Sequence, residues 1–75
     1  METVYVNLEG VEGVKRFVDT VSKIDGEFSL VEGKYIVDAK SIMGILSLDL
    51  SEKIRLEIET GDDAVLQKLG PFLVN

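Results

Sequence analysis

Few side chains of this 75-residue sequence could carry covalent or acid–base chemistry, because it contains no histidine and no cysteine. Without imidazole the chain lacks the commonest general base and metal ligand, and without thiols it can form neither disulfides nor zinc–thiolate sites. Carboxylates, lysines and hydroxyls remain. The hydroxyl in the most distinctive setting is that of Ser41, within Lys40-Ser41-Ile42-Met43-Gly44. Its oxygen is suited to accept a hydrogen bond from a free backbone N–H at the start of a helix.

Two other groupings have weaker chemical meaning. The carboxylates of Glu59, Asp62 and Asp63 suggest calcium, but their spacing fits no calcium-binding loop, and acidic residues are common at helix starts. The segment from Gly10 to Gly13 lacks the lysine and the glycine spacing of a phosphate-binding loop. We therefore expect no metal site and no bound cofactor.

The charge balance excludes two classes of partner. Eight basic residues stand against fourteen acidic ones, a net charge of −6. Such a chain repels nucleic-acid backbones and anionic membrane surfaces. Its apolar runs are too short to span a bilayer, and its first residues do not form a signal peptide. These features predict a cytoplasmic protein.

Hydrophobic periodicity predicts the elements that must position these side chains. Alternation predicts strands, steps of three and four predict helices, and Gly33 and the Gly70-Pro71 pair mark turns. The expected elements are strands at 2–8, 27–31, 34–37 and 53–59, and helices at 11–23, 41–48 and from 61 to about 70, after which Phe72 and Leu73 return to the core. The segment 41–48 is too short and too apolar for periodicity to decide, and its helix is expected from Ser41 as a suitable N-cap. The order β-α-β-β-α-β-α predicts a single α+β domain over residues 1–75. In it, a four-stranded antiparallel sheet carries three helices on one face, as an open-faced β-sandwich.

In a chain of this length and order of elements, the stretch Ala39-Lys40-Ser41-Ile42-Met43-Gly44-Ile45-Leu46-Ser47-Leu48 resembles a known motif. It is similar to the regulatory-serine motif of HPr, the histidine-containing phosphocarrier family of the bacterial sugar phosphotransferase system. Further matches are Ser22-Lys23, Asp25, Leu30 and Gly33-Lys34. The resemblance is good from about Val14 to Glu59 and poor at both ends.

The same resemblance places the family's histidine site at the start of the first helix. There the family carries a phosphoryl-accepting histidine, then an arginine and a proline, and the corresponding positions here are Gly10, Glu12 and Gly13. The resemblance thus implies a divergent member without the phosphoryl-accepting residue. Transfer through histidine is excluded because the sequence has none.

What the family implies for this chain is regulation through Ser41. HPr kinase/phosphorylase would phosphorylate it, and the product would bind a catabolite control-type regulator or other phosphotransferase components. Lys40, Ile42, Met43, Gly44 and Leu46 would form the partner-binding surface. The chain would not be an enzyme.

Three other interpretations stay open at this stage. Ser41 could serve only as a helix cap, with Ile42 and Met43 in the core. The chain could be a phosphocarrier with a non-histidine acceptor, such as a carboxylate of Glu9 or Glu12. It could also be a constitutive binding domain or a homodimer that associates through the apolar stretch 42–50.

Overall fold

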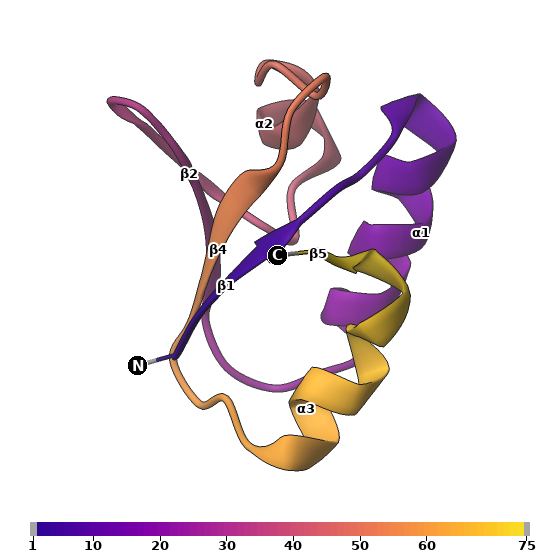
Figure 1. Cartoon of the computed structure of the whole chain (residues 1–75), viewed down its shortest axis with the longest axis vertical. Coiled ribbons are helices and arrows are strands. Elements are labelled where there is room, and N and C mark those ends of the chain that lie inside the picture. Colours follow the sequence, from indigo (N-terminus) through magenta and orange to yellow (C-terminus); the bar gives the residue numbers. More distant parts are fainter. Residues whose placement is uncertain (1, 75) are drawn as a thin grey trace.

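A computed structural model describes residues 2–74 and shows helices packed on one face of an antiparallel sheet (Figure 1). The elements are β1 (Glu2–Val6), α1 (Gly10–Ser22), β2 (Phe28–Glu32), β3 (Tyr35–Asp38), α2 (Ile42–Leu46), β4 (Ile54–Ile58), α3 (Asp63–Lys68), a 3₁₀ turn η1 (Gly70–Phe72) and β5 (Leu73–Val74). The expected α+β class, the antiparallel sheet and the three helices on one face are confirmed.

The sheet has five strands, so the expectation of four was wrong. Its order is β3-β2-β4-β1-β5, and all pairings are antiparallel. The additional strand arises because η1 returns the chain to the sheet, where Leu73 pairs with Val6 and Val74 with Tyr5. Two residues are too few to show alternation in a sequence, and a strand this short leaves no periodic signal.

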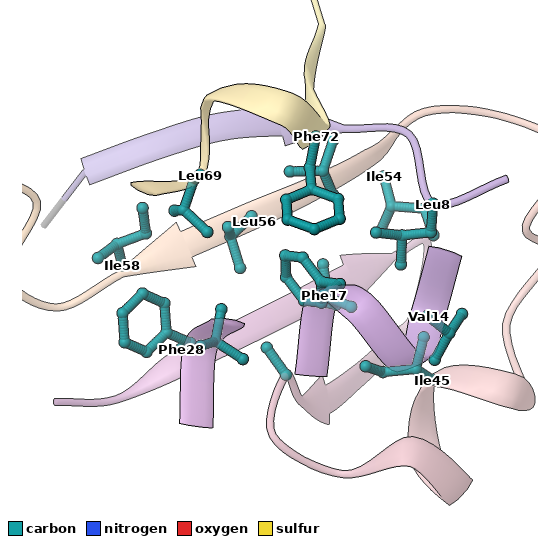
Figure 2. Packing of buried hydrophobic residues seen from close by; sticks show 14 of the residues in the cluster. Leu8, Val14, Phe17, Phe28, Ile45, Ile54, Leu56, Ile58, Leu69 and Phe72 are labelled. Atoms are coloured by element: carbon teal, nitrogen blue, oxygen red, sulfur yellow. The ribbon is translucent and has the colours of Figure 1, made fainter. Parts of the chain in front are cut away.

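The core lies between the sheet and the helices (Figure 2). Leu30 and Leu56 point inward from neighbouring strands and are fully buried. Phe17 of α1 meets Phe72 of η1 edge to face, with ring centroids 5.4 Å apart and an interplanar angle of 86°. That geometry is the preferred one for aromatic pairs. The expected return of Phe72 to the core is thereby confirmed.

Local sequence signals explain the ends of the last helix. Asp62 caps α3, its carboxylate accepting a hydrogen bond from the N–H of Val65 at 2.9 Å. Pro71 lies in the following 3₁₀ turn, where its missing N–H is tolerated. No helix within residues 2–74 has the length and apolar character needed to cross a membrane.

Candidate functional site

Ser41 lies where the chain leaves β3 and enters α2. The N–H of Ser41 donates to the carbonyl of Asp38 at 3.0 Å, and the N–H of Lys40 donates to the Asp38 carboxylate at 2.9 Å. This turn places Ser41 at the N-cap of α2, where its Oγ accepts a hydrogen bond from the N–H of Gly44 at 3.2 Å. The hydroxyl is partly buried and remains close to the surface.

Helix α2 is apolar on its exposed side as well as on its buried side. Ile45 is fully buried, whereas Met43 exposes 81% of its surface and Ile42 and Leu46 expose 39% each. The three exposed side chains belong to the helix that Ser41 caps. We call Ile42, Met43 and Leu46 the α2 patch.

Gly44 is held by neighbours within the chain. A Cβ at this position would lie 3.3 Å from Cβ of Val37 and 3.4 Å from Oγ of Ser41, tighter than most van der Waals contacts. The glycine therefore lets α2 pack closely on β3. The structure thus gives Gly44 a role within the fold, whereas the family resemblance placed it on the partner-binding surface.

Lys40 directs its ammonium group away from the helix that follows it. The Nζ donates to the carbonyl of Ile24 at 2.9 Å and of Gly26 at 3.1 Å, and lies 5.6 Å from the ring centroid of Phe28. These contacts tie the turn before α2 to the segment that runs from the end of α1 to the start of β2. Sequence reasoning missed this function, because nothing in the local pattern indicates a lysine that reaches back sixteen residues.

The start of α1 carries the positions that correspond to the family's histidine site. Glu9 is the only residue other than glycine with a positive φ in residues 2–74, at φ 50°, and Gly10 follows at φ 86°. Glu9 is the N-cap residue, but its side chain caps nothing. Glu12 lies 3.9 Å from Nζ of Lys15, both side chains being well exposed. Such a pair contributes little to stability.

Gly13 is buried because the chain before α1 passes directly over it. A Cβ built there would overlap the carbonyl oxygen of Leu8, so any side chain would force the backbone to move. The position that the resemblance assigned to a proline is therefore one where, in this structure, only glycine fits.

The segment that leaves α2 is acidic. Asp49 accepts hydrogen bonds from the hydroxyl and the N–H of Ser51, and these bonds hold the pKa of the Asp49 carboxyl below its ordinary value. The N–H of Asp49 donates to the Glu32 carboxylate at 2.9 Å, which ties this segment to the end of β2.

The two candidate regions are neighbours in the fold. Val14 of α1 and Ile45 of α2 both belong to the core cluster and the two helices are in contact, so the start of α1 and the α2 patch belong to adjoining helices (Figure 2). No cluster of potential metal ligands occurs in residues 2–74. The arrangement offers a partly buried, helix-capping hydroxyl beside exposed apolar side chains, which is suited to protein recognition.

The protein is an α+β open-faced antiparallel β-sandwich whose second helix is capped by a serine. Comparison with known proteins identifies the family. The family model described as "PTS HPr component phosphorylation site" matches residues 13–74. The match begins at Gly13, so Gly10 and Glu12 precede it.

A solved structure agrees with this family match. The crystal structure of HPr-C-His from Thermoanaerobacter tengcongensis superposes with a TM-score of 0.76 at 30% identity, over 95% of this chain and 89% of that chain. No curated protein sequence matches. The chain belongs to the HPr family of the phosphotransferase system, whose members are phosphocarrier proteins that act together with other proteins of that system.

Proposed function

We propose that this chain is a regulatory HPr-family protein, switched by phosphorylation of Ser41 and read by a protein partner at the α2 patch. The observation that carries the proposal is the juxtaposition of a near-surface hydroxyl at the N-cap of α2 with exposed Ile42, Met43 and Leu46. The proposal places the chain in the cytoplasm as a single HPr-like domain.

The absence of histidine favours regulation over phosphoryl transfer. A phosphohistidine needs an imidazole, and the sequence contains none. At the start of α1, Glu12 would repel a phosphoryl group, and the side chain of Glu9 makes no capping contact. Ser41 is the remaining residue that the family resemblance assigns to phosphorylation.

Phosphorylation would change the surface far more than the fold. A phosphate adds about −1.5 to −2 charges and three strong acceptor oxygens. At the N-cap of α2 these oxygens would lie near backbone N–H groups that a helix start leaves without partners. The α2 patch would then present a dianion beside exposed apolar side chains, a combination that a partner with a basic and an apolar contact could recognise.

The direct test is incubation with HPr kinase/phosphorylase and ATP, followed by mass spectrometry of peptides. We expect one phosphate, on Ser41, and none in Ser41→Ala. Ser47→Ala is the matched control, since Ser47 belongs to the same segment but its hydroxyl donates to the carbonyl of Gly44 instead of capping the helix. Label on another residue, or no label on a folded wild-type protein, would refute the proposal.

A second experiment separates the switch from constitutive binding through the exposed apolar side chains. Ser41→Asp keeps an N-cap acceptor and adds a negative charge, so the helix start should remain intact. For a phospho-switch, Ser41→Asp and Ser41→Ala should bind a catabolite control-type regulator with different affinities in a titration. Equal affinities would favour constitutive binding.

Incubation with phosphorylated enzyme I tests the remaining alternative, a carrier that uses a carboxylate. We expect no label, because within residues 2–74 the one cation paired with the carboxylates of Glu9 and Glu12 is Lys15, which lies 3.9 Å from Glu12 and is well exposed. A hydroxylamine-sensitive label on either residue would instead establish a carrier.

A further inference from the structure

The edge strand β3 exposes apolar side chains that the fold does not use. β3 ends the sheet order, and within residues 2–74 it pairs with β2 alone. Ile36 exposes 70% of its surface and Tyr35 exposes 68%. The strand contains no proline. Natural proteins usually protect such edges, because the unpaired backbone groups can bind another strand.

The pairing of β3 with β2 determines which backbone groups point outward. The N–H of Ala39 donates to the carbonyl of Phe28 at 2.9 Å, continuing the register in which Ser29 faces Asp38. Because hydrogen-bonded and non-bonded pairs alternate in an antiparallel ladder, Val37 and Tyr35 also bond toward β2. The N–H and carbonyl of Ile36 and the N–H of Asp38 therefore point to the free edge, whereas the Asp38 carbonyl already accepts from the N–H of Ser41 at 3.0 Å.

The side chains along this edge are complementary to a second copy of themselves. Ile36 and Asp38 lie on the face of β3 opposite the core, because Ile36 pairs with Val31, whose neighbour Leu30 points into the core, and the exposed Lys34 lies in the turn directly before the strand. If two β3 strands pair antiparallel about a two-fold axis at Ile36, Lys34 of each copy faces Asp38 of the other. Shifting the two strands by two residues in either direction keeps the same faces together but no longer places Lys34 opposite Asp38.

We propose that β3 is a homodimer interface, joining two copies edge to edge into a continuous ten-stranded sheet. The Ile36 side chains meet at the two-fold axis, Lys34 and Asp38 pair across it on both sides, and Tyr35 faces Val37 of the second copy on the other side of the sheet. The charge complementarity identifies a second copy of this chain as the occupant. The inference does not depend on phosphorylation of Ser41.

The interface is short, so association should be concentration-dependent. In sedimentation experiments from micromolar to millimolar protein we expect the mass to rise from 8.3 kDa toward twice that value. Ile36→Lys places like charges at the two-fold axis and should keep the chain monomeric throughout. Val74→Lys is the matched control, because Val74 is also exposed but lies on the opposite edge of the sheet, and it should leave dimerisation unchanged.

Charge reversal tests the register itself. Lys34→Glu and Asp38→Lys each create like-charge pairs, so each alone should dimerise at least tenfold more weakly than the wild type. When the two variants are mixed, the introduced glutamate faces the introduced lysine, and the native Asp38 faces the native Lys34. The mixture should regain wild-type association.

Circular dichroism of each variant verifies the fold, which matters for Asp38→Lys because Asp38 accepts the Lys40 N–H. A wild-type protein that stays monomeric at millimolar concentration would overturn the proposal. So would dimerisation that Ile36→Lys leaves intact, dimerisation that Val74→Lys abolishes, or folded charge variants whose mixture shows no rescue.

Discussion

Gly13 shows how a single atom constrains the start of α1. The carbonyl oxygen of Leu8 occupies the place where a Cβ would project. We expect Gly13→Ala to lower the free energy of unfolding by about 3 kcal/mol, although alanine is the better helix former by about 1 kcal/mol. Urea denaturation monitored by circular dichroism measures the change.

Gly70→Ala is the control for this prediction. Nothing lies within 4 Å of a Cβ at Gly70, and its φ is not positive. The free energy of unfolding of the Gly70→Ala variant should stay within about 0.5 kcal/mol of the wild-type value, as for most surface changes. Equal stabilities for the two alanine variants would show that the chain before α1 moves aside without cost.

At the residue scale, local chemistry was predictable and long-range contacts were not. The capping role of Ser41 follows from its position before a short apolar helix, and the structure confirms the hydrogen bond to Gly44. The contacts of Lys40 with Ile24 and Gly26 depend on how distant segments meet, which spacing within the sequence does not encode.

At the scale of elements, the facing of β4 was predictable because it alternates clearly. Ile54, Leu56 and Ile58 are buried as expected, while Arg55 between them is exposed. The facing of α2 could not be derived in the same way. A helix of five residues is too short for periodicity, and four of its five residues are apolar.

Leu56→Ala tests the facing of β4. Leu56 is fully buried, and β4 pairs with both β1 and β2. We expect a loss of about 2 to 5 kcal/mol from the removed contacts and the cavity left behind. A domain of this size has a total stability of about 4 to 11 kcal/mol, so this loss should be a large fraction of it and should lower the melting temperature clearly.

Leu46→Ala makes the same chemical deletion on the exposed side of α2. Because Leu46 is 39% exposed, its loss should cost about 1 kcal/mol or less. Thermal melts of the two variants give the comparison. If the Leu46 variant were the less stable of the two, our account of which leucine supports the core would be wrong.

At the scale of the whole molecule, sheet order predicts which parts open first. β4 is hydrogen-bonded on both sides near the middle of the sheet, whereas β3 and β5 are its edges. In dilute protein we expect the amides of β4 to exchange with solvent most slowly and those of β3 and β5 fastest. Hydrogen exchange followed by NMR measures this order, and edge amides as slow as those of β4 would contradict it.

The overall architecture was predictable because α1 and the long strands have clear hydrophobic patterns, and consecutive elements could pack in few ways. The fifth strand was not, since β5 consists of two residues placed by the turn at Gly70–Phe72 and by contacts of Phe72 with Phe17. The position of β5 in the sheet therefore depends on tertiary packing and not on a local sequence preference.

The ammonium group of Lys40 can bind either the carbonyls of the 24–26 segment or a phosphate on Ser41, so the two contacts compete. It already serves the carbonyls of Ile24 and Gly26. A phosphate on Ser41 could recruit this neighbouring charge only by releasing those carbonyls to water, so the gain from the new ion pair would be reduced by the bonds given up. By reciprocity, any ligand that loosens the 24–26 segment would strengthen the hold of Lys40 on such a phosphate, and any ligand that clamps the segment would weaken it.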